Sequence, residues 1–136
     1  MILLVHMLFG AAIASNVQNV YLAVILAFLG HYLLDLLPHV EYSIKKIRVA
    51  LDFFIGLLLI FIFSNNHYII YICAMVAIIP DGLSVIGMLI ESKILKTHSF
   101  IHQEKIHFLK HKKISNFWRI SSQMAVAIIS IILLKI

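Results

Sequence analysis

Long apolar runs, interrupted by a few short polar stretches, make up most of this 136-residue chain. Hydrophobic residues account for 62% of the sequence and charged residues for only 12%, whereas a soluble domain has about 25% charged residues. Inside a bilayer only helices or closed barrels satisfy the backbone, and the runs lack the alternation of a barrel strand. The sequence therefore predicts an all-α integral membrane protein that forms a single domain over residues 1–136.

Five apolar segments predict about five transmembrane or partly inserted helices. We expect these helices at about 2–14, 20–37, 49–63, 67–90 with a break at 80–82, and 122–134. A full span needs about 20 residues, so the first, third and fifth segments are short for a complete crossing. A signal peptide has basic residues before its apolar run, and the first segment has none. It is therefore interpreted as a membrane helix.

Basic residues fall in alternate connections, which predicts the orientation of the helices. The connections 39–48 and 91–121 carry most of the Lys and Arg residues, whereas 15–19 and 64–66 carry none. Basic connections stay in the cytoplasm, so the N-terminus is expected inside, in a prokaryotic inner membrane. Helical spacing of apolar residues in the basic cytoplasmic loop 91–121 predicts an amphipathic interfacial helix on anionic lipid headgroups, with His107 at the surface. No nucleic-acid partner is expected from this charge pattern.

Acidic and imidazole side chains interrupt the apolar segments at one expected level of the membrane, near its cytoplasmic face. His31 and Asp35 are four residues apart on one helix, and His98 and His102 have the same spacing. Such groups can bind a divalent metal, for which zinc is the first choice and manganese or magnesium the alternatives. The candidate ligands are His6, His31, Asp35, His39, Asp81, His98 and His102. Asp52 or Glu104 is the candidate general base.

Each of these groups also has a purely structural interpretation. His31 and Asp35 could form a hydrogen-bonded pair that neutralises itself within the membrane. Asp52 could pair with the basic stretch that precedes it, and Asp81 could cap the helix that follows it. His6, alone on an apolar helix, could be an ordinary packed residue. Position alone does not decide between these interpretations and a metal site.

Four short stretches carry a resemblance to a known family. HMLFGAAIAS, GHYLLDLLPH, IIPDG and KTHS resemble pieces of the small membrane-bound metal-dependent hydrolases, the bacterial inner-membrane family described as LexA-binding. GHYLLDLLPH is also similar to a His-x-x-x-Asp segment of zinc-dependent phospholipases C. The chain departs from the first family in the order of these motifs and in the residues that flank them. The resemblance implies an all-helical membrane hydrolase with metal ligands at His6, His31, Asp35, Asp81 and His98.

Together these features predict a membrane-embedded metal-dependent hydrolase that cleaves an ester or phosphoester of a lipid-like substrate at the cytoplasmic leaflet. The expected partner is a membrane lipid or another amphiphile that arrives from the bilayer. Two alternatives are a divalent-cation or proton transport protein, because Asp and His chains also carry ions, and a non-catalytic membrane scaffold. Five short helices leave little material to enclose a polar site, so a homo-oligomer is a further expectation.

Overall fold

The computed structural model describes residues 3–40, 46–90, 92–107 and 112–134. Every regular element in these ranges is a helix and none is a strand, which confirms the all-helical class. The elements are α1 (Leu3–Asn16), α2 (Val20–Asp35), α3 (Lys46–Phe63), α4 (Tyr68–Val76), α5 (Ile79–Leu89), α6 (Lys93–Phe100), the π-helix η1 (Ile101–Ile106) and α7 (Asn116–Leu133). Among the described helices, α7 alone is long and apolar enough to cross a membrane, while α1 and α2 are apolar but shorter.

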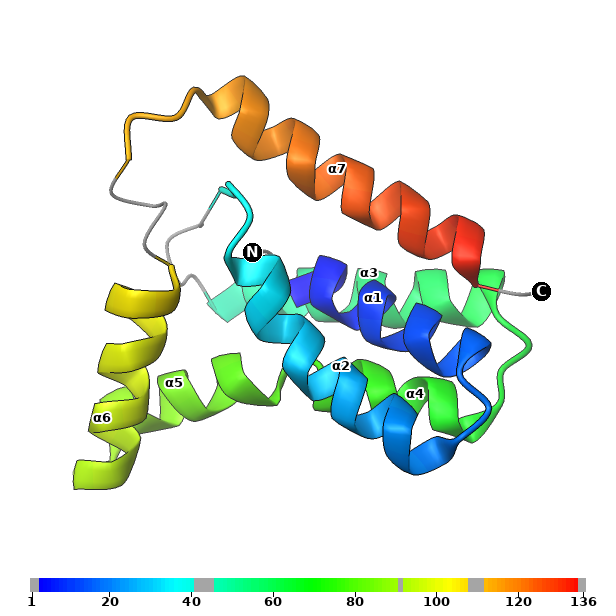
Figure 1. The fold of residues 1–136 in the computed structure, drawn as a ribbon, viewed down its shortest axis with the longest axis horizontal. Coiled ribbons are helices and arrows are strands. Elements are labelled where there is room, and N and C mark those ends of the chain that lie inside the picture. Colours follow the sequence, from blue (N-terminus) through cyan, green and yellow to red (C-terminus); the bar gives the residue numbers. More distant parts are fainter. Residues whose placement is uncertain (1–2, 41–45, 91, 108–111, 135–136) are drawn as a thin grey trace.

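The first helix is the centre of the fold. Helix α1 packs against α2, α3, α4 and α7 (Figure 1), and half of its residues are buried. Gly10 permits the close approach of α4, because a Cβ atom at this position would lie 2.5 Å from the carbonyl oxygen of Cys73. Since His6 belongs to this central helix, its imidazole is carried into the interior of the protein.

The fourth apolar segment bends earlier than the sequence suggested. Helix α4 ends at Val76 and α5 begins at Ile79, so the break lies at residues 77–78 and not at 80–82. Pro80 falls in the first turn of α5, where its missing N–H costs nothing. The N-cap is Ile78 and no side chain caps this end, so Asp81 is not used as a cap. The break also leaves the carbonyl of Ala77 facing α2.

The basic segment that follows α5 is largely helical. Helix α6 continues directly into η1, and both lie at one end of the molecule, where α6 packs against α5 (Figure 1). Helix α7 begins at Asn116, earlier than the expected start near 122, and Arg119 in this added stretch donates to the carbonyl of His39. The α6–η1 segment and the start of α7 thus both lie next to one buried polar cluster.

Candidate metal centre

Helix α2 supplies the two innermost groups of the cluster. His31 and Asp35 are fully buried, and His31 Nε2 lies 3.0 Å from Asp35 Oδ2. The Nδ1 atom of His31 lies 2.7 Å from the carbonyl oxygen of Ala77, which can only accept, so Nδ1 carries a proton. In the neutral ring the lone pair of Nε2 then faces a carboxylate oxygen. Two acceptors at this distance require a proton or a cation between them.

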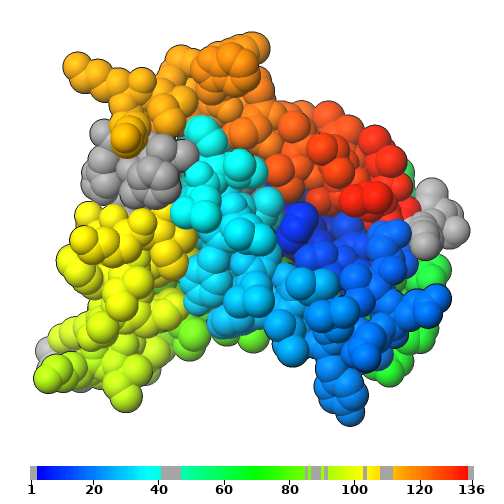
Figure 2. All heavy atoms as spheres, in the orientation of Figure 1, coloured from blue at the N-terminus to red at the C-terminus, as the bar shows by residue number. Residues whose placement is uncertain are grey.

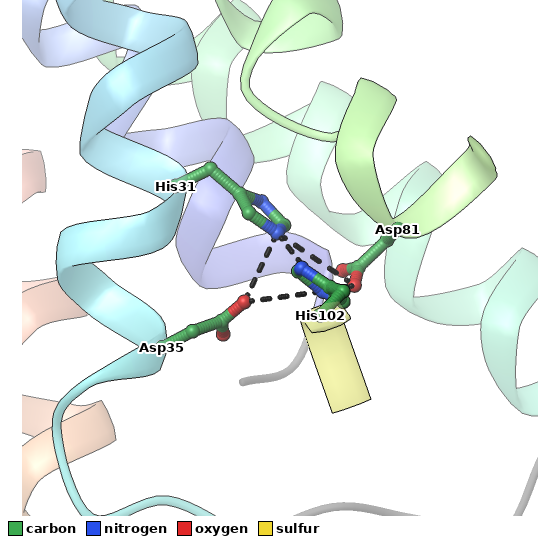
Figure 3. Close-up of side chains that lie close together, drawn as sticks. All are labelled: His31, Asp35, Asp81 and His102. Carbon is green, nitrogen blue, oxygen red and sulfur yellow. Dashed lines mark hydrogen bonds and ion pairs between the residues drawn. The ribbon is translucent and has the colours of Figure 1, made fainter. Parts of the chain in front are cut away.

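Two further groups come from α5 and η1. Figure 3 shows His31, Asp35, Asp81 and His102 pointing toward one another. His102 Nε2 lies 3.5 Å from Asp35 Oδ2 and 3.3 Å from Asp81 Oδ1. His102 is buried, whereas 28% of the Asp81 side chain remains accessible. Asp81 is therefore the member through which the cluster meets its surroundings.

His107, which the sequence placed at the surface, is a buried member of the cluster. Its Nε2 atom lies 3.1 Å from Asp35 Oδ2 and 3.3 Å from His102 Nε2. The cause is the π-helix: the backbone N–H of His107 bonds to the carbonyl of His102, five residues earlier. On an α-helix two residues five apart point about 140° away from each other. The wider π turn instead aligns them on one face.

A chain of histidines sets the proton positions on His107. His39 Nδ1 lies 2.7 Å from the carbonyl oxygen of Leu37 and therefore donates to it. In the neutral ring His39 Nε2 is then an acceptor, and it receives the Nδ1–H of His107 at 3.0 Å. The lone pair of His107 Nε2 consequently points at Asp35. His31 and His107 thus reach the same carboxylate oxygen with acceptor atoms.

The spacing of these atoms fits a small tetrahedral ion. Ligand atoms of a four-coordinate zinc ion lie about 3.3 Å apart, because each bond to the metal is about 2.0–2.1 Å long. Five separations among the Nε2 atoms of His31, His102 and His107 and Asp35 Oδ2, all except that between His31 and His107, run from 3.0 to 3.5 Å. Two groups of residues could each hold an ion, and they share Asp35: His31, Asp35, Asp81 and His102, and Asp35, His39 and His107.

His6 contacts the opposite oxygen of the shared carboxylate. Its Nε2 atom lies 3.2 Å from Asp35 Oδ1, and its ring stacks on that of His31 with centroids 4.1 Å apart. The ring is fully buried, and its Nδ1 atom finds no hydrogen-bond partner among the described residues. His6 therefore supports the orientation of Asp35, and it is not among the residues of either candidate metal group.

The first turns of α7 hold the segment that carries His39. Gln123 Nε2 donates to the carbonyl of Val40 at 2.9 Å, and the hydroxyl of Ser122 donates to the carbonyl of Pro38. Arg119 Nη1 donates to the carbonyl of His39 at 3.4 Å. Three consecutive carbonyls thus bind to one helix. This fixes the backbone of His39, and through it the ring that orients His107.

His98 lies at the margin of the cluster. Its ring is parallel to that of His102, with centroids 5.7 Å apart, and its Nε2 atom lies 3.5 Å from the hydroxyl oxygen of Tyr32. Burial, together with the neighbouring His102, lowers the pKa of His98 below its ordinary value. A lowered pKa keeps the ring neutral. Of the predicted i,i+4 pair, His102 belongs to a candidate metal group and His98 lines its edge.

The two candidate bases lie elsewhere in the described structure. Asp52 Oδ2 accepts the backbone N–H of Leu4 at 3.0 Å, at the start of α1, where a carboxylate complements the helix dipole. Glu104 is exposed on η1. Neither residue belongs to the two groups that could hold an ion, and a role as general base stays a prediction for both.

Most of the cluster could be named from the sequence. His31, Asp35, His39, Asp81 and His102 were expected as ligands, and all five belong to a group that could hold an ion. His107 was missed, because α-helical spacing gives no signal for a π turn. No protein-family model matches the chain, and neither the curated proteins nor the solved structures give a significant match.

Proposed function

We propose that this protein is a membrane-embedded metal-dependent hydrolase whose substrate is an ester or phosphoester of an amphiphile. The observation that carries the proposal is the meeting of His31, His102 and His107 on one oxygen of Asp35, at separations of 3.0–3.5 Å. Hydrogen bonds to carbonyls and to His39 direct two of these nitrogens inward as acceptors. Such a set of acceptor atoms around one carboxylate is complementary to a cation.

The donor set favours zinc. Imidazole nitrogen suits zinc better than magnesium, which prefers oxygen and an octahedral shell. Two carboxylates, Asp35 and Asp81, balance the charge of one divalent ion, so the loaded cluster is formally neutral while its histidines are neutral. Neutrality matters because an uncompensated charge in this interior would be strongly unfavourable.

The exposed surface supports a position in the bilayer. Helices α2, α3 and α7 carry large apolar side chains at their outer faces, where a soluble monomer would rarely expose a patch of more than about 300–600 Å². Figure 2 shows α2 along one face, between the α6–η1 segment and α7. Exposed members include Tyr21, Leu29, Leu33, Leu51, Phe54, Phe61, Phe117, Trp118 and Ile132. Lipid is the solvent that such faces prefer.

A catalytic role follows from the accessible side of the cluster. When bound, a divalent ion lowers the pKa of water to about 7 and draws electron density from an ester oxygen. Asp81 is partly accessible and can hold the position of an attacking water by accepting its hydrogen bond. The buried His6 contacts the other oxygen of Asp35, so this ligand is held in place before substrate arrives.

The test is hydrolysis by the purified protein in lipid nanodiscs. Decyl p-nitrophenyl phosphate and p-nitrophenyl decanoate report on the two bond types. We expect chelation to remove the activity, zinc to restore it, and His102→Ala to lose it while His67→Ala, at the exposed N-cap of α4, keeps it. A stoichiometric metal without activity on either class would favour the scaffold, and zinc flux into sealed vesicles would favour transport.

A further inference from the structure

A pocket of about 330 Å³ lies beside the cluster. Of the residues in the candidate metal groups, His102 alone lines it. It is lined by Tyr32, His98, Ile101, His102 and Ile106. The pocket lies between the C-terminal half of α2 and the outer side of α6–η1. His102 belongs both to this wall and to a candidate metal group, so the pocket and the cluster are continuous.

Apart from His98 and His102, the lining of the pocket is aliphatic or aromatic. Ile101 and Ile106 of η1 and the ring of Tyr32 form this part of the lining. The Tyr32 ring is itself held edge-on by Phe28 and His31, with centroids 5.5 and 5.4 Å away. Its hydroxyl oxygen turns to His98. A hydrocarbon group thus finds apolar contacts along this wall and a polar boundary where the cluster begins.

The outer rim continues onto the lipid-facing side of α2. Leu29 and Leu36 lie one turn before and after Tyr32 on the same helix face, and both are exposed. A chain that lies along this face reaches the pocket without crossing water. Lateral access of this kind suits an amphiphile held in a membrane and does not suit a small soluble ester.

We propose that this pocket binds the alkyl or acyl chain of the substrate and thereby places its ester or phosphoester group at His102 and Asp81. The inference deepens the proposed function and rests on it. Its consequence is specificity by chain length, since each buried methylene strengthens binding by about fourfold. Loss of the pocket removes the preference for long chains and leaves the cluster intact.

The test fills the pocket and labels its occupant. Ile106→Trp fills it, Ile101→Trp does so from the other end, and Ile94→Trp is the matched control, because Ile94 is 81% exposed on α6 and does not line the pocket. The first readout is kcat/KM for decyl against methyl p-nitrophenyl phosphate, or for the two matching carboxylic esters. We expect the ratio to fall by about tenfold or more in the filled variants, with unchanged metal content.

The second readout does not depend on hydrolysis. A decyl phosphonate with a diazirine near the chain end is photolysed with the protein in nanodiscs, and adducts are mapped by mass spectrometry. We expect adducts at Tyr32 or within 101–106, lost in Ile106→Trp and kept in Ile94→Trp. Adducts spread over α3 and α7, equal in all variants, would overturn the pocket. A wild type without metal or activity but with the expected adducts would instead overturn the proposed function.

Discussion

At the scale of single residues, the distinctive feature of the cluster is that hydrogen bonds at the far side of two histidine rings leave unprotonated nitrogens facing Asp35. The carbonyls of Ala77 and Leu37 accept hydrogen bonds from the Nδ1–H groups of His31 and His39. His39 Nε2 in turn accepts from the Nδ1–H of His107. Each bond leaves an acceptor nitrogen on the inner side. The hydrogen bond to His39 thus sets the tautomer of His107, as the outer hydrogen-bond partners of ligands do in metal proteins.

His39→Ala tests this relay. The substitution removes the acceptor for the Nδ1–H of His107, so the ring loses both its orientation and its preferred tautomer. We expect zinc affinity to fall by about 10–100-fold, measured by competition with a chromogenic chelator. Retention of wild-type affinity, with His67→Ala as the matched control, would show that His39 plays no part in orienting the site.

The same reasoning gives a prediction for the end of α7. Gln123→Leu removes the side-chain bond to the carbonyl of Val40 but keeps a buried side chain of similar volume. We expect a weaker metal affinity with a smaller change than in His39→Ala, because two of the three bonds to residues 38–40 remain. Arg119 and Ser122 supply those bonds. An affinity lower than that of His39→Ala would contradict this order of effects.

At the scale of elements, one close helix contact and one wide turn place the ligands. Gly10 lets α1 approach α4, and from these two segments His6 stacks on the ring of His31 while the Ala77 carbonyl accepts from its Nδ1 atom. The π-helix η1 supplies the other half by aligning His102 with His107. Gly10 contributes no candidate ligand of its own, whereas η1 contributes His102, and the cluster depends on both.

Gly10→Ala against Gly82→Ala tests the close contact. The added methyl at Gly10 meets the Cys73 carbonyl, so we expect a loss of about 1–3 kcal/mol in stability. At Gly82 nothing lies within 4 Å, and alanine should stabilise α5 by about 0.5–1 kcal/mol. Thermal unfolding in detergent, followed by circular dichroism, measures both. Equal midpoints for the two variants would rule out the close α1–α4 contact.

At the scale of the whole molecule, the arrangement gathers polar groups at one end of an apolar bundle. The candidate ligands come from helices α2, α5 and η1 and from the residues that follow α2 and η1. The outer faces of α2, α3 and α7 remain apolar. In a bilayer we expect the cluster near one leaflet, and the basic segments predict that this leaflet is the cytoplasmic one.

Cysteine labelling tests this orientation. Cys73 is buried and can be replaced by alanine, which leaves a background without other thiols. In this background a membrane-impermeant maleimide should label Asn65→Cys in intact cells and Lys112→Cys only after lysis. Both positions are exposed in the structure. The reverse pattern would invert the topology, and labelling of both in intact cells would argue against membrane integration.

The fold class and most ligands could be predicted because they depend on local patterns. Apolar runs indicate helices, and the spacing of His31 and Asp35 puts both on one face. His107 could not be predicted, since the π turn is a departure from that spacing. The break at 77–78 and the early start of α7 were missed for another reason. Each has a tertiary hydrogen bond that local spacing does not show, from His31 to the carbonyl of Ala77 and from Arg119 to that of His39.

The metal content of the purified protein tests the centre most directly. Wild type, His31→Ala and His67→Ala are expressed with added zinc, passed over a gel-filtration column and assayed by inductively coupled plasma mass spectrometry. We expect at least one zinc per chain in wild type and His67→Ala, and its loss in His31→Ala at an unchanged elution volume. A wild type without metal, or a His31→Ala variant that keeps its full content, would contradict a metal centre at this cluster.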